Sequence, residues 1–313
     1  MKTVDPIPER LFPHFLDPVD GTLCLPASSN AADIAARVVP HRLRFPLLVD
    51  PEAPLHRQLA AVTYAPASCR FGPLCDNILG VNWRLPGGQT ARIGERVVKT
   101  TTGYDWLRFL LHSGSRLGEP IDYVLRLRPD SGFQMTARLD GPEETLRTCV
   151  GKLLRGGWMH WWENVDFVVD NATAFLRVGV YCPADEGSLF EEHLTQTAAG
   201  LNLGLNLQTN APVVFDGLPD VTVKTTPDRA IVLATELARR AEKCVAFCYN
   251  GVVHVHLGEC KDIAERAHAL MQPYLGEVHA IGGDWHSRWL PATPPSITES
   301  QWIETLEQAI HEA

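Results

Sequence analysis

After Ser131 the sequence alternates between short strand patterns and amphipathic helix patterns. Short alternating or continuous apolar runs are typical of strands, whereas apolar residues three and four positions apart are typical of helices. The first set of predicted elements is a strand over 133–139, a helix over 143–154, strands over 167–169 and 174–181, and a helix over 189–198. The second set is a helix over 229–242, strands over 244–249 and 252–257, a helix over 263–271 and a strand over 278–281. This β-α-β-β-α-β order predicts a ferredoxin-like antiparallel sheet with helices on one face, present once or duplicated.

The part of the chain before this alternation has a less regular pattern. Residues 30–39 predict a short helix, because apolar residues recur on one helical face behind an N-cap at Asn30 or Ser29. Pro129 closes this part, so we expect an α+β chain with one domain over 1–129 and a second over 130–313. The remaining predicted elements are strands over 43–49, 96–100 and 123–128 and helices over 105–112 and 299–311.

The composition narrows the class of protein. A chain of 313 residues with 45% hydrophobic and 21% charged residues can bury the core of about two domains. No run approaches the roughly 18 to 20 apolar residues of a membrane span, and the first 13 residues carry no apolar segment typical of a secretory signal, so we expect a cytoplasmic protein without a membrane span. The net charge of −9 and the scattered basic residues argue against nucleic acid as a partner.

The eight cysteines are dispersed along the chain and lack the paired spacing typical of zinc sites. We therefore predict no metal site and interpret the cysteines as reduced, small core residues.

Four stretches in the first domain have a recognisable order, namely 75–80, 94–105, 107–118 and 123–129. They contain an aspartate ahead of a Leu-Gly pair, a Val-Lys followed by Gly-Tyr-Asp, a glycine-containing turn and a strand that ends in proline. In this order the chain resembles the flavin-linked 2-hydroxy-acid oxidases, and specifically the FAD-binding subunit of glycolate oxidase. The resemblance implies an FAD-binding domain over 1–129 and the C-terminal domain of an FAD-linked oxidase over 130–313.

The resemblance also implies which residues would bind the cofactor. Glycine-rich turns let backbone amides approach the phosphates of a nucleotide. The implied cofactor-binding residues are Asp76, Gly80, Lys99, Gly103, Tyr104 and Gly118. Purely structural roles are an alternative, with a buried tyrosine hydroxyl at Tyr104 and helix capping by Asp105 or Thr102.

Several positions depart from the family pattern. The family's N-terminal phosphate loop has no counterpart, as if about one subdomain were missing, and residues 54–67 contain no glycine where a second loop is expected. Glu119 takes the place of an uncharged residue on the strand that lies along the nucleotide. We therefore expect FAD to bind weakly or not at all.

The second domain holds the candidate catalytic residues. Where related oxidases have a histidine-rich segment, this chain has Phe247, Asn250 and Gly251 followed by His254. The resemblance implies hydride abstraction from the α-carbon of a small 2-hydroxy acid onto the flavin, with His254, His256 and Arg177 as candidates for the base and the carboxylate site. The alternative is a hairpin with a type I′ turn at Asn250-Gly251 and two half-exposed histidines on its second strand.

Two functional hypotheses remain. In the first, the chain is a flavoprotein that works with other subunits of a 2-hydroxy-acid dehydrogenase complex, and it is compatible with a homo-oligomer. In the second, it is a flavin-free binding or assembly module derived from that family. The aromatic cluster of Trp158, Trp161 and Trp162 around Glu163 either lines a pocket or partner interface or packs over a sheet.

Overall fold

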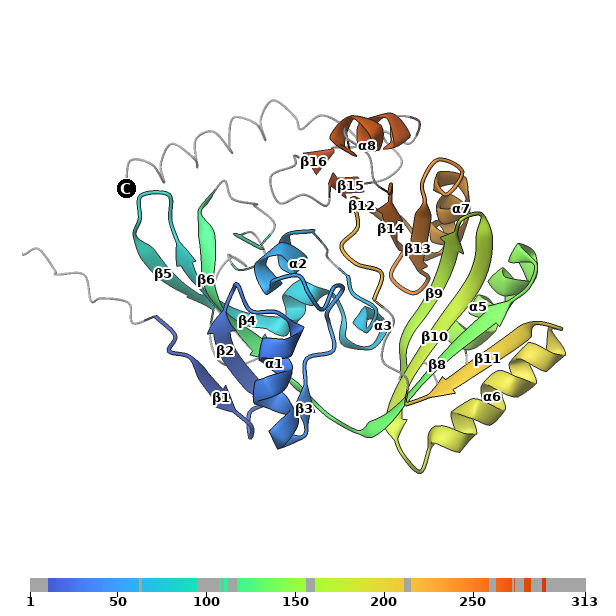
Figure 1. Ribbon diagram of the computed structural model, residues 1–313, viewed down its shortest axis with the longest axis horizontal. Helices are drawn as coiled ribbons and strands as arrows, with labels where there is room; N and C mark the ends of the chain where they lie inside the picture. The colour runs from blue at the N-terminus through green and yellow to red at the C-terminus, as the bar shows by residue number, and fades with distance from the viewer. Residues whose placement is uncertain are drawn as a thin grey trace, which may run out of the picture.

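A computed structural model describes residues 11–61, 64–94, 107, 110–111, 117–155, 161–210, 215–258, 263–271, 273, 279–282 and 289–290. Two antiparallel sheets dominate it, and they lie side by side with the first helices between them (Figure 1). The first sheet has five strands in the order β1-β2-β6-β4-β5. These strands are β1 (Phe15–Asp17), β2 (Thr22–Pro26), β6 (Glu119–Arg126), β4 (Ile78–Arg84) and β5 (Thr90–Gly94).

Short helices pack against this first sheet. They are α1 (Ala31–Val38), α2 (Leu55–Ala61) and α3 (Ser68–Phe71), with 3-10 turns over Val39–His41 and Leu74–Asn77. The predicted cap of α1 is confirmed, because the Asn30 side chain accepts from the Asp33 amide at 3.1 Å and the Asp33 carboxylate accepts from the Asn30 amide at 3.0 Å. This reciprocal capping satisfies two amides that the helix itself leaves without partners.

The predicted strand over 43–49 is mostly wrong. Only β3 (Leu43–Arg44) forms, and it pairs with β7 (Arg128–Pro129) in a two-stranded sheet. Pro46 has no amide to donate to a strand ladder, and the Val49 amide instead donates to the buried Gln58 side chain at 2.8 Å. Residues 45–49 bury apolar side chains without being part of a sheet.

The second sheet confirms the ferredoxin-like prediction and shows that the motif is duplicated. The first unit consists of β8 (Gly132–Asp140), α5 (Glu143–Arg155), β9 (Trp162–Asp170), β10 (Thr173–Pro183), α6 (Gly187–Gly200) and β11 (Gly204–Thr209). The second consists of β12 (Val221–Lys224), α7 (Pro227–Leu237), β13 (Lys243–Phe247), β14 (Val252–His256), α8 (Ile263–Met271) and β15 (His279–Gly282). Their strand orders, β11-β8-β10-β9 and β13-β14-β12-β15, mirror each other. The β9–β13 pair joins the units, and β16 (Trp289–Leu290) extends the edge.

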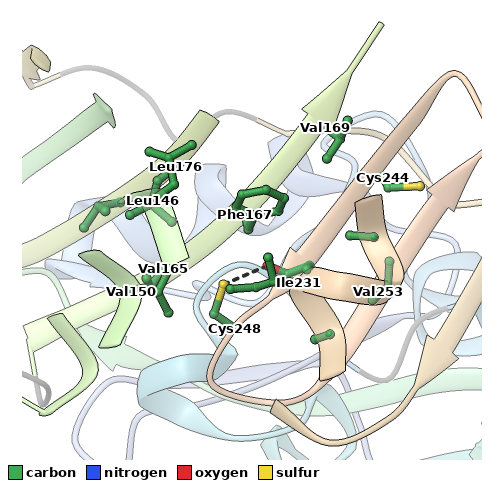
Figure 2. Close-up of a cluster of buried hydrophobic side chains, with 14 of the residues drawn as sticks. Leu146, Val150, Val165, Phe167, Val169, Leu176, Ile231, Cys244, Cys248 and Val253 are labelled. Atoms are coloured by element: carbon green, nitrogen blue, oxygen red, sulfur yellow. Dashed lines mark hydrogen bonds between the residues drawn. The ribbon is translucent and has the colours of Figure 1, made fainter. Parts of the chain in front are cut away.

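The main core lies between this nine-stranded sheet and helices α5, α6 and α7, which cover one face (Figure 1). Figure 2 shows how Leu146 and Val150 of α5, Ile231 of α7, and strand residues such as Phe167 meet there. The described cysteines are free thiols, and all but the half-buried Cys69 are buried, which confirms their interpretation as small core residues. None of the helices in the described ranges is long and apolar enough to cross a bilayer.

The predicted hairpin between β13 and β14 forms, but its turn differs from the prediction. Phe247 pairs with Val252, so the loop has four residues rather than two. A type I′ turn needs two residues with positive φ, and here Gly251 has a φ of 68° whereas Asn250 does not have a positive φ. A Cβ atom on Gly251 would lie 2.4 Å from the Thr225 carbonyl oxygen, so the loop is pressed against the segment before α7.

Candidate functional site

The face of the nine-stranded sheet opposite its helices turns toward the five-stranded sheet (Figure 1). This face carries a buried group of charged side chains. Strand register explains why they meet, because Arg177 of β10 lies opposite Asp166 of β9, and Lys243 of β13 lies opposite His256 of β14. Asp216 lies in the segment before β12, and its carboxylate accepts hydrogen bonds from Arg177. We call these residues, together with His254, the polar face.

Arg177 is held between two carboxylates. Its Nε and Nη2 donate to Asp166 Oδ2 at 3.2 and 3.0 Å, and its Nη1 and Nη2 donate to the two oxygens of Asp216 at 3.0 and 2.6 Å. Lys243 Nζ lies 2.6 Å from Asp216 Oδ1. The side chains of Arg177, Asp166 and Asp216 are only 7%, 1% and 6% exposed. Two cations and two anions therefore neutralise each other inside the protein.

Burial and pairing act in opposite directions on the pKa values of this group. Burial alone would lower the pKa of Arg177, but the charges of Asp166 and Asp216 raise it above its ordinary value. Burial alone would raise the pKa of Asp216, but Arg177 and Lys243 hold it below its ordinary value. Asp166 is buried completely, and this burial raises its pKa to about 6 against the opposing charge of Arg177. Arg177 and Asp216 are thus charged at neutral pH, and the charge of each stabilises the charged form of the other.

The two histidines of β14 are uncharged. Burial, with His256 as the next cause, lowers the pKa of His254 to about 3, and burial also lowers the pKa of His256. Among the described residues neither Nε2 atom has a hydrogen-bond partner, and the His254 ring packs edge-on against Phe247 with centroids 4.6 Å apart. The interpretation of half-exposed histidines is wrong for His254, which is 1% exposed. A neutral imidazole with so low a pKa is a weak general base.

The described part of the chain holds no group of three His, Cys, Asp or Glu side chains placed to bind a metal ion. The polar face therefore offers ion pairs and two neutral imidazoles. The catalytic roles of His254, His256 and Arg177 stay predictions.

Two of the implied cofactor-binding glycines are packed against the protein itself. A Cβ atom on Gly80, in β4, would lie 2.8 Å from the Phe12 ring. Gly118 has a φ of 111°, and a Cβ atom there would lie 2.0 Å from the Arg84 carbonyl oxygen. Glu119 is exposed and pairs with Arg84 at 2.5 Å. Close chain packing thus accounts for these two glycines without a nucleotide.

The structure describes only one of the other four implied cofactor-binding residues. Asp76 is exposed in the 3-10 turn Leu74–Asn77. Lys99, Gly103 and Tyr104 lie outside the described residues, as do the predicted strand over 96–100 and the predicted helix over 299–311.

Side chains fill the junction between the two sheets. Helix α3 packs against β9, Arg44 forms an ion pair with the buried Glu163, and Arg70 Nη1 donates to the Tyr181 carbonyl oxygen at 2.7 Å. A cavity beside Glu163 and Arg177 has a volume of about 10 Å³, which is about the space of one water molecule. Small-molecule sites are usually on the order of 300 Å³ or larger.

Sequence reasoning found Arg177, His254 and His256 but missed Asp166, Asp216 and Lys243. Asp166 had a usable signal, because it is a charged residue between apolar neighbours, with Val165 before it and Phe167 after it. Asp216 had no such signal in the sequence, because it lies in a segment without regular secondary structure.

Comparisons with known proteins agree with this architecture. No family model matches the chain. Among curated proteins, 86 residues are 30% identical to the mitochondrial D-lactate dehydrogenase [cytochrome] of Arabidopsis thaliana, which is 28% of this chain and 15% of that protein. A solved alkyldihydroxyacetonephosphate synthase has a TM-score of 0.61 and 8% identity, covering 97% of this chain and 64% of its own. The BBE-like 1 protein of Physcomitrella patens has a TM-score of 0.60 and 12% identity, covering 82% of this chain and 67% of its own.

These likenesses define the class of fold. The chain has the α+β fold of the FAD-linked oxidases, as predicted, and spans about two thirds of the length of the two solved structures.

Proposed function

We propose that this chain is an FAD-linked oxidoreductase-family protein that resembles the FAD-binding subunit of glycolate oxidase and has a weakened or lost flavin site. The observation that carries the proposal is the filled junction between the two sheets, where Arg44, Arg70 and Glu163 take up the space. The fold supports the family, and the packing of Gly80 and Gly118 against protein atoms supports the weakened site. This packing supports a junction that does not fit the ring system of a flavin.

The partners of the chain follow from the same proposal. Residues 54–67 contain no glycine where the family has a phosphate-binding loop. Another subunit of a cytoplasmic 2-hydroxy-acid dehydrogenase complex, or a second copy of the chain, would supply the missing flavin contacts.

A second candidate is a flavin-free binding or assembly module from the same family. The neutralised polar face favours it, because Arg177 already holds Asp166 and Asp216 in place of a substrate carboxylate. An anionic substrate would have to displace a buried carboxylate, which costs several kcal/mol.

The absorption spectrum of the purified full-length chain and its thermal stability with and without added FAD test both candidates. We expect a colourless protein that gains little or no stability from FAD. A yellow protein with stoichiometric flavin would contradict the weakened site. If excess FAD restores dye reduction by glycolate or D-lactate, the first candidate stands. If FAD neither stabilises the protein nor restores activity, the result supports the flavin-free module.

A further inference from the structure

Three arginines converge on one aromatic ring at the junction between the two sheets. Arg44 comes from β3, Arg70 from α3 and Arg128 from β7. Their guanidinium carbons lie 5.9, 5.1 and 4.8 Å from the centroid of the Phe71 ring. Residues from three different elements thus bring their positive charges to the same place. We call Arg44, Arg70 and Arg128 the arginine cluster.

The cluster has more positive than negative charge. Glu163 pairs with Arg44 through both of its oxygens. Within the described ranges, neither Arg70 nor Arg128 forms an ion pair with a carboxylate, and the nearby Asp130 accepts from the Tyr181 hydroxyl. Three guanidinium groups therefore face Glu163 and the nearby Asp130, so positive charge exceeds negative charge in the cluster.

This excess destabilises the cluster while no anion is bound. Burial, and then the charges of Arg126, Arg70 and Arg44, lower the pKa of Arg128 to about 10. Burial is also the largest cause of the lowered pKa of Arg70, against which the charge of Glu163 acts. Like charges that are partly withdrawn from water repel each other strongly, so an anion placed among them would be stabilised.

The cluster also keeps hydrogen-bond donors available. Arg128 Nη2 donates to Asn77 Oδ1 at 2.6 Å, and Arg70 uses Nη1 for the Tyr181 carbonyl oxygen. The Nε atoms of Arg44 and Arg128 are buried, and among the described residues they have no partner. Arg70 and Arg128 are only partly buried, so a small ligand can reach them from solvent.

Aromatic rings hold these arginines in place. Arg44 lies 3.3 Å from the centroid of the Tyr181 ring, and Arg70 lies 4.9 Å from that of Trp161. Stacking on aromatic faces orients a guanidinium group and lowers the entropy that it loses on binding an anion. This assigns part of the predicted tryptophan cluster to the frame of a site. Trp162, by contrast, is buried in the core against Phe190.

We propose that the arginine cluster binds a phosphate group of a small molecule. A phosphate group carries the negative charge that this positive excess attracts, and its oxygens accept hydrogen bonds from several guanidinium groups at once. The site goes beyond the proposed function, because it uses neither of the glycine loops through which the family would hold FAD. The phosphate could be inorganic or part of a nucleotide, FAD included.

Titration calorimetry of the full-length chain with inorganic phosphate, pyrophosphate, AMP and FAD tests the site, with chloride and acetate at equal ionic strength as references. We expect at least one phosphate compound to bind, and Arg128→Gln to weaken its binding on the order of tenfold. Arg138→Gln is the matched control, since it removes one positive charge from an exposed pair with Asp140 and should leave the affinity unchanged.

The ligands separate the two sources of phosphate. Inorganic phosphate that binds as tightly as AMP would support a site for the group alone, whereas binding restricted to AMP or FAD would support a site for the phosphate of a larger ligand. Arg70→Lys provides a second variant with a retained charge, in case Arg128→Gln does not fold. If no phosphate compound binds better than chloride and acetate, or if both substitutions in the cluster leave the affinity unchanged, the assignment is wrong. FAD binding that ignores these substitutions would contradict the assignment and, separately, the weakened flavin site.

Discussion

Replacing Asp216 with asparagine should destabilise the protein strongly, because its carboxylate balances two buried cations. It accepts hydrogen bonds from Arg177 at 3.0 and 2.6 Å and lies 2.6 Å from Lys243 Nζ. Asparagine has nearly the same size but no charge, so the substitution changes electrostatics rather than packing. Arg177 would then keep only the carboxylate of Asp166, and Lys243 would lose its ion pair with Asp216.

The size of the effect follows from this burial. Removing one partner of a buried ion pair costs about 3 to 5 kcal/mol. Since Arg177 keeps its bonds to Asp166, we expect the lower end, about 3 kcal/mol. The matched control is Asp140→Asn, which breaks an exposed pair with Arg138 and should cost about 1 kcal/mol or less.

Urea unfolding of the full-length chain, followed by tryptophan fluorescence and circular dichroism, measures both free energies of unfolding. If Asp216→Asn costs no more than Asp140→Asn, the buried charge balance does not hold this face together. Lys243→Gln gives an intermediate test, with an expected loss of about 1.5 kcal/mol, because it removes the more exposed of the two cations.

Two further predictions concern His254 and the turn glycines. Because the pKa of His254 falls from 6.5 to about 3 on folding, the unfolded chain takes up a proton first as the pH drops, and stability decreases below about pH 6.5. Between about pH 7 and about pH 5 the wild type should lose about 2 kcal/mol more than His254→Gln, and equal losses in urea unfolding would refute the buried neutral imidazole. The raised pKa of Asp166 acts in the opposite direction but is common to both proteins. Gly118→Ala should lower stability by about 3 kcal/mol through its clash with a β4 carbonyl, whereas Gly132→Ala, with a φ of 84° but open space, should cost about 1 kcal/mol, and similar thermal unfolding of the two variants would count against the close packing.

Much of the secondary structure could be predicted because its signals are local. The cap at Asn30 lies next to the helix that it starts, and the apolar spacing over 143–154 is contained within α5. The order of these elements then predicted ferredoxin-like units. Predictions failed where distant partners decided the outcome. Residues 45–49 lie outside the sheets, and the Val49 amide there donates to the Gln58 side chain. The loop at Gly251 is shaped by its contact with Thr225.

The candidate site was predicted only in part. Arg177, His254 and His256 were named as separate residues, and the sequence carries no sign that Arg177 is neutralised by Asp216, 39 positions away. The arginine cluster was not predicted either, since Arg44 and Arg128 meet only after β3 pairs with β7.

The sequence by itself determined most elements after Ser131 and their order, because caps and periodicity act over a few positions. The tertiary structure alone decided how the two ferredoxin-like units join through β9 and β13, and which charges are balanced. In the folded protein two carboxylates neutralise Arg177, whereas the arginine cluster keeps more positive than negative charge. Electrostatic energies depend on distance and burial in space, and neither can be read from positions along the chain.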